Sequence, residues 1–290
     1  MEKLIEKAGI LMEALPYIQQ FRDSIVVVKL GGSVMENEAK TRSVLRDVVF
    51  MECAGMRPVV VHGGGKAISA RLKEAAIETR FIHGLRYTDE KTMGIVDRVM
   101  HAEINARLVS LMQEFEGRPC AVSGRNILRA ERISGFDPKT GAATDLGFVG
   151  QVTEVDTEQL QWVLNRRQVP VITPLGKDMN GTIYNINADM AACRIAAALK
   201  APKLVFLSDV PGILTDPAKP DSLISTIAVE QVEPFIADGI IQGGMVPKVR
   251  SAVDALRAGT GKVHMIDGRI QHSLLLEIFT VKGIGTQIVP

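Results

Sequence analysis

The stretch Ile25-Val26-Val27-Val28-Lys29-Leu30-Gly31-Gly32-Ser33 decides the fold of this chain. Its β-branched residues do not alternate with polar ones, which is typical of a strand covered on both faces in the parallel sheet of an α/β protein. The run ends at two glycines, just after Lys29. Glycine N–H groups approach anions closely, and open α/β sheets bind ligands at the carboxyl ends of their strands. The pattern therefore favours a phosphate-binding turn, although the same residues also occur in purely structural turns.

Composition favours a small-molecule ligand. The chain has 290 residues, enough for one large α/β domain or two lobes that share a sheet. The chain has 34 Lys and Arg residues and 33 Asp and Glu residues, which gives a formal net charge of +1. It therefore lacks the excess of basic residues that is typical of a nucleic-acid-binding protein. No apolar run approaches the roughly 20 residues of a membrane span. Glu2, Glu6 and Glu13 lie where a secretion signal would be uniformly apolar, so the N-terminus does not have the pattern of one. We expect a cytoplasmic protein with no nucleic-acid or membrane partner.

The cysteines give no sign of a disulfide or metal framework. Cys53, Cys120 and Cys193 are far apart and fall within apolar segments. We expect all three to be reduced core residues.

A second glycine turn follows the apolar segment 57–61. His62-Gly63-Gly64-Gly65 connects this strand to a helix that is expected from about Lys66 to Ala76. Converging N–H groups with a helix N-terminus behind them favour a phosphate site. The motif is neither the GxGxxG fingerprint nor a Walker A loop. His62 is either a ligand contact or a hydrogen-bond partner of a neighbouring loop.

Arg86 lies just before a long helix that Thr88 or Asp89 is expected to cap. In this place an arginine either pairs with a surface carboxylate or offers its planar fork to a substrate carboxylate. Further along, the polar stretch 125–145 is expected to form a hairpin or flap.

Two more polar constellations follow in the second half of the chain. Asn185, Asn187 and Asp189 alternate on one side of an extended segment that enters a helix. Helix capping alone would explain Asp189, but not the two asparagines, which indicate a pocket wall. After another apolar strand, Asp209 to Leu214 forms a turn suited to a nucleotide, and Gly243-Gly244 brings Lys248 to a helix N-terminus.

Together these motifs resemble the amino acid kinase family. The matching segments are Lys-Leu-Gly-Gly, Val-His-Gly-Gly-Gly, Gly-Leu-Arg-Tyr-Thr-Asp, Asn-Ile-Asn-Ala-Asp, Leu-Ser-Asp-Val-Pro-Gly-Ile-Leu and Gly-Gly-Met-Val-Pro-Lys. They occur in the family's order and approximate spacing, and the likeness runs from Ile25 to Pro290. It is strongest to members that phosphorylate N-acetyl-L-glutamate. The chain departs at Lys66, where an uncharged residue is expected, and at Ser33, where alanine is common.

The resemblance implies a three-layer αβα sandwich with a mainly parallel central sheet and two lobes, preceded by an extension helix. Residues 1–22 would be an oligomerisation helix. Residues 23–176 would form an N-lobe for substrate binding and dimerisation, and residues 177–290 a C-lobe for nucleotide binding and arginine sensing.

The implied reaction is ATP-dependent phosphorylation of the γ-carboxylate of N-acetyl-L-glutamate to N-acetyl-L-glutamyl 5-phosphate, a step of arginine biosynthesis. A γ-carboxylate with a pKa of about 4.3 is already ionised at neutral pH, so no general base is needed. The reaction requires positive charge and N–H donors around the transferring phosphoryl group instead.

The resemblance also implies roles for individual residues. Lys29 and Lys248 would stabilise the transition state, with Asp189 holding both ammonium groups. The substrate would be bound by Gly64, Gly65, Arg86 and Asn185. The ATP site would comprise Gly32, Asp209, Val210, Pro211, Gly212, Ile213 and Leu214. Mg²⁺ would be held mainly by phosphate oxygens and water, with no protein ligand.

The N-terminal segment Met1–Gln20 carries an apolar stripe, and Pro16 is expected to break or kink its helix before Tyr17. The helix packs either on its own domain or on another subunit. The resemblance implies the second arrangement: a homo-hexamer (trimer of dimers) inhibited by L-arginine, with Tyr17, Glu277 and Gly285 near the effector. A PII-type regulatory protein is a further candidate partner.

Three alternatives remain from the sequence. Another member of the family would act on glutamate, carbamate, aspartate or a nucleotide. A non-catalytic sensor on the same fold is disfavoured by the retained Lys29, Asp189 and Lys248. A dinucleotide-dependent oxidoreductase is disfavoured because the GxGxxG fingerprint is missing.

Overall fold

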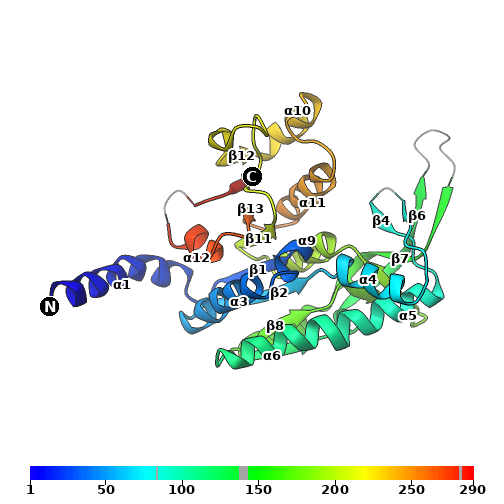
Figure 1. Ribbon diagram of the computed structural model, residues 1–290, viewed down its shortest axis with the longest axis horizontal. Helices are drawn as coiled ribbons and strands as arrows, with labels where there is room; N and C mark the ends of the chain where they lie inside the picture. Colours follow the sequence, from blue (N-terminus) through cyan, green and yellow to red (C-terminus); the bar gives the residue numbers. More distant parts are fainter. Residues whose placement is uncertain (83, 137–142, 281–282) are drawn as a thin grey trace.

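The computed structural model describes residues 1–82, 84–136, 143–280 and 283–290. Its centre is an eight-stranded sheet in the order β12-β14-β13-β11-β1-β2-β8-β5 (Figure 1). The strands are β1 (Ile25–Leu30), β2 (Arg57–His62), β5 (Pro119–Val122), β8 (Val169–Ile172), β11 (Lys203–Ser208), β12 (Thr226–Ala228), β13 (Lys262–Asp267) and β14 (Thr286–Val289). Neighbouring strands are parallel except β13 and β14, which are antiparallel. The predicted, mainly parallel sheet is confirmed.

Helices cover both faces of this sheet. One face packs against α8 (Thr157–Asn165), α9 (Ala188–Ala198) and α11 (Met245–Arg257), and the other against α3 (Glu38–Cys53), α6 (Ala106–Glu114) and α12 (Ser273–Ile278). Val27 faces the first group, and Val26 and Val28 face the second. All six residues of β1 are buried, which explains why its sequence shows no polar alternation. The three-layer sandwich is therefore as predicted.

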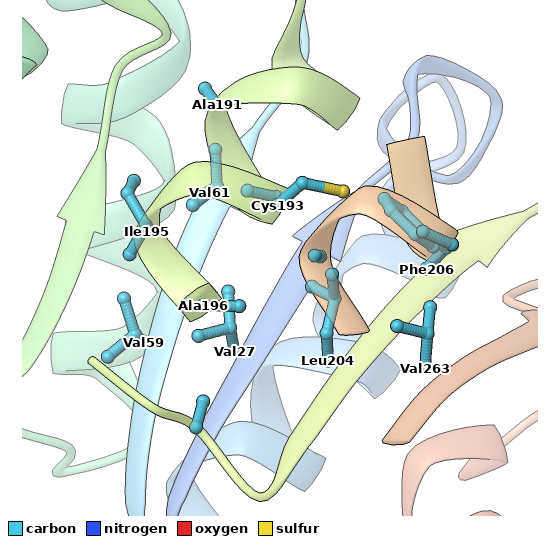
Figure 2. Packing of buried hydrophobic residues seen from close by; sticks show 14 of the residues in the cluster. Val27, Val59, Val61, Ala191, Cys193, Ile195, Ala196, Leu204, Phe206 and Val263 are labelled. Atoms are coloured by element: carbon cyan, nitrogen blue, oxygen red, sulfur yellow. The ribbon is translucent and has the colours of Figure 1, made fainter. Parts of the chain in front are cut away.

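Small residues allow α9 to lie close to the sheet. Figure 2 shows side chains of α9 beside those of β1 and β2: Ala191, Ile195 and Ala196 with Val27, Val59 and Val61. This packing fixes the first turn of α9 over the carboxyl edge of the sheet.

The predicted hairpin in 125–145 is confirmed as the pair β6 (Leu128–Phe136) and β7 (Ala143–Val155), with the connection 137–142 outside the described residues. The sequence did not indicate that β6 and β7 also close into a small barrel with β9 (Leu175–Lys177) and β10 (Ile183–Ile186). The short pair β3 (Phe81–Ile82) and β4 (Leu85–Arg86) lies beside it.

The predicted long helix after Asp89 is present but not uniform. It comprises α5 (Glu90–Arg98), a π-helical segment η1 (Val99–Asn105) and α6. Asp89 caps it, since its side chain accepts the N–H of Thr92 at 2.8 Å. The remaining helices are α1 (Glu2–Phe21), α2 (Gly32–Met35), α4 (Gly65–Glu74), α7 (Gly124–Ile127) and α10 (Val232–Ala237), with 3-10 turns η2 (Pro220–Ser222) and η3 (Val229–Gln231).

Helix α1 projects away from the sheet (Figure 1). We expected Pro16 to break or kink this helix; a break is ruled out, because the helix continues to Phe21. Proline removes one N–H, and water can bind the carbonyl that is left without a partner on so exposed a helix. The apolar side chains that α1 leaves in solvent include Leu4, Ile5, Ile10, Leu11 and Met12. Of the helices in the described ranges, none has the length and apolarity to cross a membrane.

The cysteine prediction is partly wrong. All three are free, as predicted, but only Cys193 is buried. Cys53 is exposed on the last turn of α3, and Cys120 is half-buried on the edge strand β5. Apolar neighbours in sequence do not bury a residue at a helix end or at the edge of a sheet.

At Gly147 there is no room for a side chain beside the segment that carries Arg86. Its φ is +73°, and a Cβ here would lie 2.1 Å from the carbonyl oxygen of Thr88. Gly181 has a similar φ of +86° with open space around it. Gly181→Ala should therefore lower the free energy of unfolding only by the strain of a left-handed backbone at alanine, about 1 kcal/mol. Gly147→Ala adds a steric clash and should lower it by about 3 kcal/mol. Urea unfolding of both variants tests this; equal losses would mean that the Thr88 segment moves aside freely.

Candidate functional site

A cavity of about 450 Å³ opens at the carboxyl ends of β1 and β2. Residues of both glycine turns line it, together with Lys29, Arg86 and Asp189. These groups come from segments far apart in the sequence, and they meet because parallel strands place their carboxyl ends at one edge of the sheet.

The strongest electrostatic feature is a carboxylate shared by two lysines. Asp189, in the first turn of α9, lies 2.6 Å from Nζ of Lys29 and 2.9 Å from Nζ of Lys248. The three side chains are only 11 to 19% exposed. Burial by itself raises the pKa of Asp189, but the two ammonium charges outweigh this and lower it to about 2. The carboxylate is ionised, so two cations and one anion leave one net positive charge beside the cavity.

Asn187, and not Asp189, caps α9. The side-chain oxygen of Asn187 accepts the N–H groups of Asp189 at 2.8 Å and Met190 at 3.2 Å. The capping explanation for Asp189 is therefore wrong, and its carboxylate is left for the lysines. Asn185 donates to Oγ1 of Thr88 at 3.2 Å. The alternation is as expected, since Asn185, Asn187 and Asp189 all line the cavity.

The glycine turns supply backbone donors. Gly31 and Gly63 use their N–H groups within the protein, on the carbonyls of Leu207 and Leu30, each at 3.0 Å. Gly32 and Gly65 are the first residues of α2 and α4, where N–H groups have no intrahelical acceptor. Gly32, Gly64 and Gly65 all line the cavity, so the turns place donors where an anion would sit.

Arg86 is fixed from one side only. Its Nη2 donates to the carbonyl of Gly65 at 2.6 Å and to Oγ of Ser69 at 2.8 Å, and its guanidinium lies 4.8 Å from the centre of the Phe81 ring. Within the described part of the chain, Arg86 pairs with no carboxylate, and its buried Nη1 has no partner. The guanidinium can therefore bind a carboxylate from a ligand. Ser69 and Phe81 were not predicted as site residues; the one available signal was the position of Ser69, one helical turn after Gly65.

Lys66, the departure from the family pattern, lies at the rim of the cavity. Its ammonium group is 2.6 Å from a carboxylate oxygen of Glu36, and both side chains are largely exposed. Glu36 thus neutralises the extra charge.

The proposed nucleotide residues are only partly assembled. Gly32 and Asp209 line the cavity, but Val210 to Leu214 do not. Within this turn, the N–H of Ile213 donates to Oγ1 of Thr286 at 2.8 Å, so the turn is bound to β14. Nowhere in the described ranges do three or more His, Cys, Asp or Glu side chains gather as a metal-binding group.

The residues predicted to lie near an effector take part in two groups of contacts with the C-terminal segment, one at Glu277 and Gly285 and the other at Tyr17. Glu277 accepts the N–H groups of Ile284 at 2.7 Å and Gly285 at 3.2 Å, and it lies 2.6 Å from Nδ1 of His264. Tyr17 of α1 contacts Phe279, with ring centres 6.2 Å apart. His264 was missed, although one polar residue within the apolar strand β13 was a signal.

Comparison with known proteins identifies the family. The model of the amino acid kinase family matches residues 24–267. The chain belongs to the amino acid kinase family.

Relatives agree with this assignment. The chain is 45% identical to the acetylglutamate kinase of Heliobacterium modesticaldum, with 100% of both chains covered. Among solved structures, it resembles N-acetylglutamate synthase from Neisseria gonorrhoeae. The complex with coenzyme A and N-acetyl-glutamate matches with a TM-score of 0.86 and 26% identity, over 98% of this chain and 63% of that one. The complex with coenzyme A and L-arginine matches with 0.80 and 26%, over 97% and 65%. This chain therefore spans less than two thirds of the synthase.

The low pKa of Asp189 predicts a pH-dependent contribution to stability. Because the folded value of about 2 lies below the ordinary 3.8, ionisation of Asp189 stabilises the fold above about pH 4, and this contribution disappears as the pH falls toward 2. Asp189→Asn should lower the free energy of unfolding at pH 7 by about 2 kcal/mol, and the difference should shrink below pH 4. Urea unfolding measures this, with the exposed Asp238→Asn as control. The same pH dependence in both variants would contradict it.

Proposed function

We propose that this chain phosphorylates the γ-carboxylate of N-acetyl-L-glutamate with ATP, giving N-acetyl-L-glutamyl 5-phosphate and ADP in arginine biosynthesis. The observation that carries the proposal is the pair of lysines joined by Asp189 beside a cavity with backbone donors. The name of the full-length relative supports this choice of substrate.

The chemistry needs charge more than it needs a base. A γ-carboxylate oxygen attacks the γ-phosphorus, the bond from that phosphorus to the β–γ bridging oxygen breaks, and ADP leaves with the electron pair. Both reactants are anions, and negative charge spreads over the transferring group. Lys29 and Lys248 would offset this charge. Asp189 would hold them close together, where two unshielded ammonium groups would otherwise repel each other.

The acceptor would be held by its polar groups. The guanidinium of Arg86 would bind its α-carboxylate, because Arg86 lines the cavity and its Nη1 has no partner in the described residues. Asn185 would contact a neighbouring polar group of the substrate. The N–H groups of Gly64 and Gly65 would donate hydrogen bonds to the phosphoryl oxygens and to the acceptor.

The nucleotide would bind at the side of the cavity that Gly32 and Asp209 line, in contact with the turn from Asp209 to Leu214. Val210 to Leu214 lie outside the cavity lining, so they would contact a part of the nucleotide that extends beyond the cavity. Asp189 is already neutralised by two lysines, which fits a Mg²⁺ ion held by phosphate oxygens and water better than one held by protein. When bound, Mg²⁺ would neutralise phosphate charge.

The two-lobe division at residues 23–176 and 177–290 belongs to this proposal. The four sheet strands before residue 177 lie together as β1-β2-β8-β5, and the four after it as β12-β14-β13-β11. The two parts are joined where β11 pairs with β1 in the sheet, and where β10 pairs with β7 and β9 in the barrel. The second junction brings Asn185 to the cavity.

A coupled assay of ADP release tests the function. With N-acetyl-L-glutamate, glutamate, aspartate and carbamate as acceptors, we expect turnover to require the N-acetyl group. Lys29→Ala and Lys248→Ala should each lower kcat by roughly 10²-fold or more, since each removes a preorganised charge. Lys73→Ala, on an exposed part of α4, should behave as the wild type. Turnover of glutamate or carbamate alone would refute the substrate, and normal kcat in either lysine variant would remove that lysine from the mechanism.

Regulation is the second part of the proposal. The helix of residues 1–22 would link dimers into a hexamer, because α1 leaves a row of apolar side chains in solvent. L-arginine would bind near Tyr17, Glu277 and Gly285, where α1 meets the C-terminal segment, and would inhibit the reaction. A solved neighbour that is 26% identical binds L-arginine. A PII-type protein would be a further partner.

Removal of α1 tests the regulatory part. A chain beginning at Asp23 should be dimeric, active and much less sensitive to L-arginine, whereas the full chain should be an inhibited hexamer. Leu11→Asp, which places a charge in the exposed apolar row, should give the same dimer without shortening the chain. Light scattering and inhibition curves provide both readouts. A dimeric full chain, or a truncated chain with full arginine sensitivity, would refute this part.

A further inference from the structure

His62 is a buried group that the proposed mechanism does not use. It ends β2 and stands directly before the turn Gly63–Gly65. Its side chain is fully buried, and burial is the main cause that lowers its pKa to about 4, so the imidazole is neutral at physiological pH. A buried neutral histidine needs a defined partner for each ring nitrogen.

The partners of His62 select one tautomer. Nδ1 lies 2.9 Å from the carbonyl oxygen of Gly63, which can only accept, so Nδ1 carries the proton. Nε2 lies 3.1 Å from Nδ2 of Asn105. The same Nδ2 donates to the carbonyl of Val171 at 2.8 Å, which fixes the orientation of the amide. Nε2 is therefore the acceptor.

This hydrogen bond orients a peptide of the glycine turn. In a trans peptide, the carbonyl of one residue and the N–H of the next point in opposite directions. Because the Gly63 carbonyl is turned toward His62, the N–H of Gly64 is turned the other way. A peptide between two glycines reorients with little steric resistance. The flipped form would offer a carbonyl oxygen, and not an N–H, to a phosphoryl group in the cavity that Gly63 and Gly64 line.

The π-helical segment η1, which carries Asn105, also contacts the glycine turn directly. A Cβ on Gly64 would lie 2.8 Å from Cδ1 of Ile104 and 2.9 Å from Cε of Met100, so both side chains touch this glycine. η1 is itself anchored, since Nε2 of His101 lies 2.8 Å from Oγ of Ser123. π-helical turns are frequent at functional sites. Here the segment restrains the turn both through Asn105 and His62 and through direct apolar contact.

We propose that His62 is a positioning residue that holds the Gly63–Gly64 peptide with the Gly64 N–H facing the phosphoryl group, and that Asn105 imposes the tautomer required. The inference deepens the proposed function and rests on it, because the N–H acts only when an anion binds there.

Two similar variants separate positioning from mere packing. The amide nitrogen of asparagine can replace Nδ1, whereas that of glutamine reaches the place of Nε2. His62→Asn should therefore keep the bond to Gly63 and lose less than about fivefold in kcat. His62→Gln should lose it and fall by about 10- to 100-fold, with each KM changed by less than about threefold. Equal losses of kcat, in proportion to losses in melting temperature, would overturn the proposal.

A measurement without turnover tests the tautomer directly. NMR of the full chain with ¹⁵N-labelled histidine should show His62 neutral and protonated on Nδ1 between pH 5.5 and 8. Asn105→Asp, whose carboxylate can only accept, should move the proton to Nε2 and lower kcat. An Nε2–H tautomer in the wild type would overturn the proposal. If the wild type instead phosphorylates another acceptor of the panel, the proposed substrate fails, and the His62 variants are compared on that acceptor.

Discussion

The carboxylate of Asp189 between Lys29 and Lys248 is the interaction on which this site depends. It joins the central strand β1 to the first turns of α9 and α11. Two ammonium groups withdrawn from water would repel each other without a shared counter-charge. The pairing therefore fixes how these three elements meet, and the glycine turns and Arg86 are arranged around the charge that remains.

Much of this arrangement could be predicted from the sequence. Unbroken apolar runs in β1, β2 and β11 indicate strands covered on both faces, and these strands form the centre of the sheet. Parallel strands end at the same edge. The glycines that follow β1 and β2 therefore had to gather there, however far apart they are in the chain.

Other features depended on side-chain geometry that a linear pattern does not contain. Asn187 and Asp189 were equally good caps by type, and only the register of α9 gives the cap to Asn187. The partners of Arg86 come from α4 and β3, and barrel closure through β9 and β10 rests on pairing between distant short strands. Cys53 shows the limit of apolar context, because it is exposed at the end of α3 despite its apolar neighbours in the sequence.

The π-helical segment Val99–Asn105 also sets the rotational phase of the helix after it. Each residue advances an α-helix by about 100°, and a π turn contains roughly one residue more than an α turn. If the same residues formed a regular α-helix, Asn105 would be rotated by roughly 100° relative to Arg98, and its amide would be carried away from His62. The reach of this helix toward the glycine turn thus depends on the wider turns of η1, so a change that tightened them to α geometry without removing a residue would separate Asn105 from His62.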